Sequence, residues 1–276
     1  MKKITSKGCI SLIPEIAVKK REKSKKQQLL LTNKRVDWGF KQSVQAAQLR
    51  IEKQMEQEHK QVLLVSSTLP QEGKSMTAVN LALAFMQHEK KTVLIDGDLR
   101  KPSVAEMLGM EEQKGLAEYL KGNAKVKEVL QKKGDLTVIQ GGKVHGNISS
   151  LMDESRMEEL MTFLKSEFDY VIIDTPPMAN LIDGAIVASN CDGAIIVVEQ
   201  GAVSYRLEQK VKSQLDKTGC RVLGVVLNKV DLSQNGYYGR YGKYGKYGKY
   251  GRYGKYDKYG AYSPYEKAEA AQTTDK

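Results

Sequence analysis

Hydrophobic residues in the middle of the chain alternate between short continuous runs and longer segments with helical spacing. The continuous runs lie at residues 62–67, 92–98, 136–142, 169–174, 192–199 and 220–228. Their length and apolar character are typical of strands buried on both faces of a parallel sheet. Helical patterns lie between them, including residues 74–88, 154–166 and 203–217. The alternation predicts an α/β fold with a doubly wound, mainly parallel sheet flanked by helices.

The segment before the first run also has a helical period. Apolar residues recur there at spacings of three and four, at Val36, Phe40, Val44, Ala47, Ile51 and Met55. Such a stripe is one face of an amphipathic helix. We expect this helix to dock on the core, in preference to serving as a subunit-contact helix. The pattern at 74–88 is apolar on nearly all sides, so that helix should be buried.

Charge divides the chain into three parts. Its net charge is +11, with +9 in residues 1–60, −3 in residues 61–234, +6 in residues 235–265 and −1 in residues 266–276. We therefore predict a basic, flexible N-terminal segment (1–35), one globular domain (36–232) and a disordered C-terminal tail (233–276). Because the excess positive charge sits in the two terminal segments and the middle of the chain is nearly neutral, nucleic acid is not expected as a partner.

The cysteines and the apolar runs indicate the cellular compartment of the protein. Cys9, Cys191 and Cys220 match neither a metal site nor a disulfide framework, which favours reduced thiols in a cytoplasmic protein. No apolar run reaches the roughly 20 residues that span a bilayer. The stretch at 10–18 contains Pro14 and Glu15, so it is a poor signal peptide.

The predicted tail is a tyrosine repeat. From Tyr238 to Tyr265 every third residue is tyrosine, and most are followed by Gly and then Lys or Arg. The spacing superficially resembles collagen, but the segment is short, nearly free of proline and interrupted at Asp257, so a triple helix is not expected. Eleven tyrosines belong to the cluster: Tyr237, Tyr238, Tyr241, Tyr244, Tyr247, Tyr250, Tyr253, Tyr256, Tyr259, Tyr262 and Tyr265.

A phosphate-binding loop is predicted between the first run and the helix at 74–88. The segment TLPQEGKS occupies residues 68–75. Gly73 permits close backbone approach, the helix N-terminus supplies N–H donors, and Lys74 can reach the β- and γ-phosphates. Ser75 offers a hydroxyl to Mg²⁺. The strict P-loop pattern has Gly where this chain has Thr68.

Carboxylates follow two further strands. Asp96 and Asp98 flank Gly97 in VLIDGDLRKP (93–102), with Arg100 beside them, and Asp174 ends the strand in VIIDTPP (171–177). Either turn alone could be structural. Together with the phosphate loop, they provide a phosphate cradle, a metal site and a group that positions a nucleophile, as phosphoryl transfer requires.

These three motifs resemble the Walker A, A′ and B motifs of the bacterial tyrosine kinases that regulate capsule and exopolysaccharide synthesis, and the tail resembles that family's tyrosine cluster. The resemblance covers roughly residues 36–265. Related partition and cell-division ATPases carry an extra lysine five residues before the P-loop lysine, where this chain has Leu69. The absence of that lysine favours the kinase branch.

The resemblance implies an ATP- and Mg²⁺-dependent, non-specific protein-tyrosine kinase that phosphorylates its own tyrosine cluster in trans. It implies three sets of site residues. The catalytic set is Asp96 as the base, Lys74, and Arg100 as a charge stabiliser; the ATP-binding set is Glu72, Gly73, Lys74, Ser75, Met76 and Asn228; the metal set is Ser75, Asp98 and Asp174.

The resemblance also implies partners. It predicts a homo-oligomer, recruitment to the inner face of the cell membrane by a transmembrane activator with a cytoplasmic segment, and a tyrosine phosphatase and polysaccharide-synthesis enzymes as substrates or regulators. The chain departs from the family at Gln71, where Gly is usual, at 146–152, which lacks a proline-flanked segment, and at 44–50. The last segment reads VQAAQLR where the family has a Glu and an Arg that support assembly into a ring. Whether this chain forms such a ring is therefore left undecided by the sequence.

Two other functions remain alternatives. One is an ATP switch without kinase activity, in which the nucleotide controls dimerisation. The other is a binding protein whose Tyr- and Lys-rich tail contacts RNA or anionic lipid, because aromatics interleaved with cations can stack on bases and neutralise phosphates.

Overall fold

The computed structural model describes residues 9–14, 30–144, 151, 154–178 and 183–230. All of them belong to the first of the two units into which the chain divides, residues 1–231 and 232–276. All eleven tyrosines of the predicted cluster lie outside the described residues, as does the segment 146–152 apart from Leu151.

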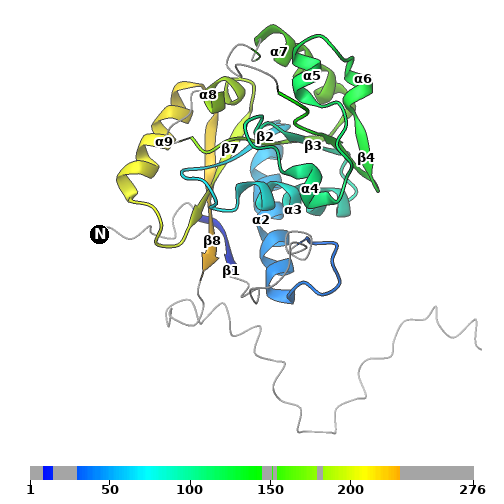
Figure 1. Cartoon of the computed structure of the whole chain (residues 1–276). Helices are drawn as coiled ribbons and strands as arrows, with labels where there is room; N and C mark the ends of the chain where they lie inside the picture. Colours follow the sequence, from blue (N-terminus) through cyan, green and yellow to red (C-terminus); the bar gives the residue numbers. More distant parts are fainter. Residues whose placement is uncertain (1–8, 15–29, 145–150, 152–153, 179–182, 231–276) are drawn as a thin grey trace, which may run out of the picture. The chain divides into compact units, whose positions relative to one another are not determined.

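An eight-stranded sheet forms the centre of the described part (Figure 1). Its spatial order is β1-β8-β7-β2-β6-β3-β5-β4, and all neighbours are parallel except β4 and β5. The strands are β1 (Cys9–Pro14), β2 (Val62–Ser67), β3 (Thr92–Asp96), β4 (Gln131–Lys133), β5 (Leu136–Ile139), β6 (Tyr170–Asp174), β7 (Gly193–Glu199) and β8 (Arg221–Val230). The predicted α/β fold with a mainly parallel sheet is confirmed.

Helices cover both faces of this sheet (Figure 1). One layer contains α2 (Trp38–Gln57), α3 (Lys74–Gln87) and α4 (Val104–Leu108). The other contains α5 (Leu116–Leu120), α6 (Val126–Val129), α7 (Glu154–Glu167), α8 (Asp183–Ala188) and α9 (Tyr205–Lys217). Strand side chains alternate between the layers: Leu63 and Val65 pack in the first, Val62 and Leu64 in the second.

The helix predicted from the 36–55 stripe docks on the core as expected. Asp37 caps α2 by accepting a hydrogen bond from the Phe40 N–H at 3.2 Å, and Val44, Ile51 and Met55 are buried. Helix α3 is buried along most of its length, which confirms the prediction for its nearly all-apolar pattern.

Two strands were not predicted. Strand β1 and the buried side chains of Leu30 and Leu31 fall in the segment predicted to be flexible, so that prediction was wrong for these residues. Strand β1 pairs in parallel with β8, and its short apolar run is surrounded by Lys- and Gln-rich sequence that conceals it. Strand β4 has the polar sequence QKK, which an edge strand tolerates because one side faces solvent.

Candidate active site

The phosphate loop connects β2 to α3 through an unusual backbone. Gly73, the N-cap of α3, has φ +95°, and Gln71 has φ +68°. Gln71 thus takes a left-handed conformation that glycine adopts readily, at the position where the resembling family has glycine. No side chain caps the N-terminus of α3, so its first backbone N–H groups remain available to an anion.

Glu72 holds this loop against the end of β7. Its side chain is 1% exposed; Oε2 accepts a hydrogen bond from the Leu69 N–H at 2.6 Å, and Oε1 accepts one from the Glu199 N–H at 3.2 Å. Burial raises the pKa of Glu72 above its usual value, although these N–H donors oppose the shift. The side chain predicted to bind ATP is therefore engaged in supporting the loop.

Lys74 lies among the predicted metal ligands. Its Nζ is 2.8 Å from Asp98 Oδ2 and 3.5 Å from Asp174 Oδ1, and it donates a hydrogen bond to Ser75 Oγ at 3.0 Å. Burial would lower the pKa of Lys74, but the negative charges of Asp174 and Asp98 outweigh burial and raise it. Lys74 is consequently a buried cation that balances two buried carboxylates.

Asp96 and Asp174 are adjacent in the paired ends of β3 and β6. Between Asp96 and Asp98, the Gly97 N–H donates to the Asp174 carbonyl at 2.7 Å, and a Cβ on Gly97 would lie 2.8 Å from that carbonyl oxygen. Only glycine fits such a close approach, which explains the Asp-Gly-Asp sequence.

Asp96 has one occupied and one available carboxylate oxygen. Its Oδ2 accepts hydrogen bonds from the N–H groups of Ser103 and Val104 at 2.8 and 2.9 Å, while Oδ1 is buried and accepts none from a described residue. Burial, with the nearby charge of Asp98, raises the pKa of Asp96 to about 6 in spite of these two donors. Asp96 Oδ1 is therefore positioned to accept a proton.

The donor set fits a magnesium ion. Both side-chain oxygens of Asp174 are buried and lack a well-formed hydrogen bond among the described residues. Burial raises the pKa of Asp174 to about 7, although the charge of Lys74 and the Ser75 hydroxyl oppose the shift. Carboxylate and hydroxyl oxygens are ligands that Mg²⁺ prefers, usually one or two carboxylates beside the phosphates and waters. Among the described residues, no group of three or more His, Cys, Asp or Glu side chains is arranged so that it could hold a metal ion without other ligands.

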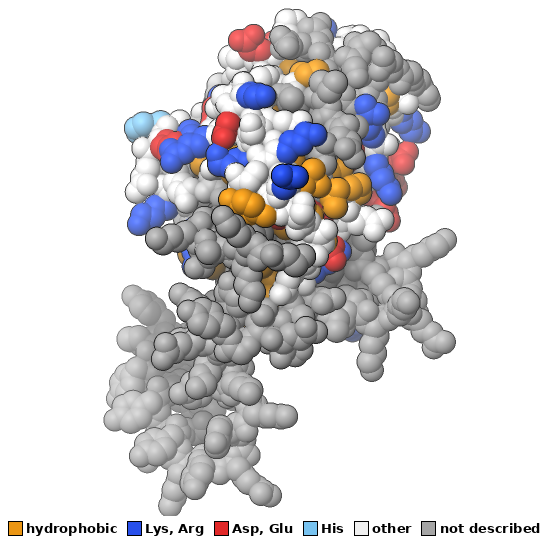
Figure 2. Space-filling model, turned by 90° about the vertical axis from the view of Figure 1, so that its left-hand side faces the viewer, with side chains coloured by type: hydrophobic (Ala, Val, Ile, Leu, Met, Phe, Trp, Pro, Cys, Tyr) orange, Lys and Arg blue, Asp and Glu red, His pale blue; other side chains and the backbone are white. Residues whose placement is uncertain are grey.

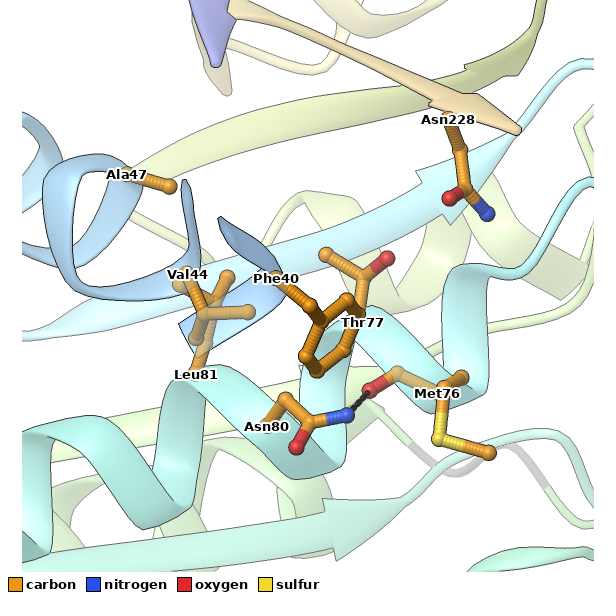
Figure 3. A pocket seen from close by; sticks show the side chains of 8 residues that line it. All are labelled: Phe40, Val44, Ala47, Met76, Thr77, Asn80, Leu81 and Asn228. Atoms are coloured by element: carbon orange, nitrogen blue, oxygen red, sulfur yellow. Dashed lines mark hydrogen bonds between the residues drawn. The ribbon is translucent and has the colours of Figure 1, made fainter. Parts of the chain in front are cut away.

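Asn228, near the end of β8, contacts the phosphate loop from the other side. Its Nδ2 donates to the Glu72 carbonyl at 2.8 Å, and a Cβ on Gly73 would lie 2.1 Å from this nitrogen. Asn228 also lines a mostly apolar pocket between α2 and α3 (Figure 3). The other lining residues are Phe40, Val44, Ala47, Met76, Thr77, Asn80 and Leu81.

The structure thus brings most of the predicted site residues to the ends of β2, β3, β6 and β8. Arg100 lies on an exposed turn after Asp98. Sequence reasoning missed the Ser103 and Val104 N–H groups that orient Asp96, because any residue type can supply a backbone donor. It also missed the contribution of Phe40 to the pocket, since that residue was assigned only to the apolar stripe of α2.

Comparison with known proteins assigns the chain to a family. Residues 58–236 match the ParA family model, described as an iron-transfer P-loop NTPase. Over 182 residues the chain is 41% identical to the tyrosine-protein kinase CpsD of Streptococcus pneumoniae serotype 4, covering 64% of this chain and 79% of that protein. The chain belongs to the bacterial tyrosine kinase family.

Two further matches agree with this assignment. The kinase domain of the Escherichia coli tyrosine kinase ETK superposes with a TM-score of 0.74 at 26% identity, covering 80% of this chain and 90% of that domain. The succinoglycan biosynthesis transport protein ExoP of Rhizobium meliloti is 32% identical over 204 residues, which cover 72% of this chain and 26% of that protein.

This bacterial tyrosine kinase is a P-loop enzyme, as the sequence predicted, and its similarity to named kinases disfavours an ATP switch without kinase activity. None of the described helices is long and apolar enough to cross a membrane.

Proposed function

We propose that this kinase transfers the γ-phosphoryl group of ATP to the eleven tyrosines of its own C-terminal cluster. The observation that carries the proposal is the convergence of Lys74, Asp96, Asp98 and Asp174 beside the uncapped N-terminus of α3. The cluster, residues 237–265, belongs to the same chain and offers a tyrosine at every third position from Tyr238.

Each side chain would have a distinct role. Lys74 would exchange its contacts with Asp98 and Asp174 for the β- and γ-phosphates, and the first N–H groups of α3 would bind the same phosphates. Ser75, Asp98 and Asp174 would hold Mg²⁺, which neutralises the charge that develops on the phosphates. Arg100, from its exposed turn, would add a further positive charge.

Asp96 is the group that would accept the phenolic proton. In the proposed step, the tyrosine oxygen forms a bond to the γ-phosphorus, the bond from that phosphorus to the ADP oxygen breaks, and the proton passes to Asp96 Oδ1. The N–H groups of Ser103 and Val104 fix the other oxygen, so Oδ1 keeps its orientation. A pKa of about 6 leaves Asp96 largely ionised at neutral pH and able to act as the base.

The adenine would lie on the side of Asn228, whose amide contacts the loop backbone. Gly73 and Met76 would complete the nucleotide site, and Glu72 would support it through Leu69 and Glu199 rather than by touching ATP.

The wider role proposed for the kinase is regulation of capsular or exopolysaccharide synthesis and export. The relative named for succinoglycan biosynthesis transport supports it. We further propose that the enzyme works in the cytoplasm as a homo-oligomer, recruited to the membrane by a transmembrane activator. A tyrosine phosphatase and polysaccharide-synthesis enzymes would be its further substrates or regulators.

Two substitutions test the assigned roles. Asp96→Asn removes the base but keeps the shape and the acceptor for Ser103 and Val104, so nucleotide affinity should change less than about threefold while tyrosine phosphorylation falls by about 10²-fold or more. Lys74→Ala should weaken ATP binding as well. Unchanged phosphorylation in Asp96→Asn would refute its role, and ATP hydrolysis without any tyrosine modification would favour the ATP switch.

A further inference from the structure

The outward face of α9 carries a row of positive charges. Val211 and Leu215 attach this helix to the core, and both are fully buried. On the opposite side, Arg206, Lys210 and Lys217 are exposed. Steps of four and seven residues keep these three side chains on one stripe of a helix. We call this set the cationic face of α9.

These charges are not neutralised by the rest of the described part. Lys212, also on α9, pairs with Asp216 at 2.6 Å, whereas none of the three residues of the cationic face has an ion pair with a described residue. Figure 2, which views the side of the molecule where α9 lies in Figure 1, shows Lys and Arg side chains gathered there. The face is therefore available to an anionic partner.

The chain leaves the sheet close to the start of this helix. Strands β7 and β8 end together, with Glu199 beside Asn228, and α9 begins six residues after Glu199 and packs against β8. The described chain ends at Val230, and Tyr237 follows seven residues later. Seven extended residues span up to about 25 Å, and the 13 residues of α9 are about 20 Å long, so the tyrosine cluster can reach this helix from its own chain.

Phosphorylation would reverse the charge of the cluster. Residues 235–265 carry +6 before modification, a charge that the cationic face repels. Each phosphotyrosine adds roughly −1.5 to −2 at neutral pH, so eleven of them would bring the segment to about −10 or lower. Three phosphate oxygens on each residue can also accept charge-assisted hydrogen bonds from Arg and Lys.

The spacing of the tyrosines is close to that of one pair of cations on α9. In a polyproline II conformation, which has three residues per turn and a rise of about 3.1 Å, tyrosines three residues apart lie on one side of the chain and are separated by about 9 Å. Lys210 and Lys217, seven residues apart on α9, are separated by about 10.5 Å along the helix axis. Two successive phosphotyrosines of such a segment could therefore contact Lys210 and Lys217, and Arg206, about 6 Å from Lys210 along the helix axis, could add a second cation to one of the phosphates.

We propose that the cationic face of α9 is a docking site for the phosphorylated tyrosine cluster of this chain. This inference rests on the tail phosphorylation proposed above and adds a consequence to it. The unmodified tail is repelled from α9, and the modified tail is held there, so a phosphorylated tail is withdrawn from further encounters with an active site.

The test uses the full chain, treated with phosphatase and kept without ATP. The probes are two synthetic peptides of residues 238–253, one unmodified and one phosphorylated on Tyr241, Tyr244 and Tyr247, with binding followed by fluorescence anisotropy. The phosphopeptide should bind at least tenfold more tightly than the unmodified peptide, and its affinity should fall as salt is raised.

Two triple variants locate the site. Arg206→Gln with Lys210→Gln and Lys217→Gln should weaken phosphopeptide binding roughly tenfold, as expected for three exposed charge pairs. The control variant replaces exposed Lys125, Lys127 and Lys132 with Gln, at α6 and β4, and loses the same charge of three. Its affinity should change less than twofold.

Other outcomes would overturn the proposal. Equal losses in both variants would show only a general effect of net charge. Loss of binding to phosphatidylserine vesicles in the α9 variant, with phosphopeptide affinity intact, would make the face a membrane contact. Because the peptide is synthetic, weak binding refutes the docking site, whereas absence of tail phosphorylation in the enzyme refutes the proposed function instead.

Discussion

The substitution Gly73→Ala tests the geometry of the phosphate loop in detail. Gly73 has φ +95°, and an L-residue in a left-handed conformation costs about 1–2 kcal/mol. The new Cβ would also lie 2.1 Å from Asn228 Nδ2, so the amide must move and lose its hydrogen bond to the Glu72 carbonyl. That bond contributes about 1 kcal/mol. The free energy of unfolding should therefore fall by about 2–3 kcal/mol in urea titrations.

A second glycine separates the two contributions. Gly201 has φ +79°, and a Cβ there would meet no atom within 4 Å. Gly201→Ala should thus show only the conformational cost, about 1 kcal/mol less than Gly73→Ala.

A double-mutant cycle provides the decisive result. Asn228→Ala removes the side chain with which the new methyl group collides, so Gly73→Ala should cost about 1 kcal/mol less in that background. If the two substitutions are instead additive to within about 0.5 kcal/mol, Asn228 does not pack on Gly73, and the described loop geometry is wrong.

Three further predictions concern stability and loop conformation. Burial, followed by the charge of Glu72, raises the pKa of Glu208 to about 7. Between about pH 4.5 and 7 the folded protein therefore holds a proton that the unfolded chain has lost, so the free energy of unfolding should fall as the pH rises through this range. Glu208→Gln should remove this pH dependence. Its free energy of unfolding should exceed that of the unsubstituted protein by about 1 kcal/mol at pH 8, a figure reduced for solvent screening of this half-buried carboxyl, and should differ little at pH 4. Gln71→Gly should alter ATP affinity less than about threefold in equilibrium titrations, because φ +68° already suits glycine. Asp192→Ala should lower the free energy of unfolding by about 2–4 kcal/mol in urea, since Asp192 Oδ2 accepts from the two N–H groups at the start of β2, at 2.8 and 3.0 Å.

Much of the fold could be predicted because buried parallel strands are continuous apolar runs. The predicted run 62–67 coincides with β2, and 169–174 differs from β6 by one residue. Strand β3 ends at Asp96, two residues before the end of the predicted run 92–98, and the Asp96 carboxylate accepts the N–H groups of Ser103 and Val104 where α4 begins. The edge strands give no such signal: β1 depends on β8, more than 200 residues later in the sequence, and β4 has the polar sequence QKK.

The site was predictable to the extent that side chains with special chemistry follow strands. Lys74, Asp96 and Asp174 were found because parallel strands bring their carboxyl ends to one edge. The supporting contacts were not visible in the sequence: Asn228 donates to a backbone carbonyl, and the carboxylate of Glu72 accepts from Leu69 and Glu199. The contacts of Glu72 with Glu199 and Asn228 depend on how segments more than a hundred residues apart approach each other.

The central claim is that this chain phosphorylates its own tyrosine cluster. Its most direct test is the intact mass of the full chain after incubation with Mg-ATP, followed by peptide mapping. We expect a ladder of whole phosphoryl groups located on residues 237–265, reduced by about 10²-fold or more in Asp96→Asn and absent from a chain whose cluster tyrosines are replaced by Phe. An unchanged mass in the presence of hydrolysed ATP, or modification confined to residues outside the cluster, would contradict it.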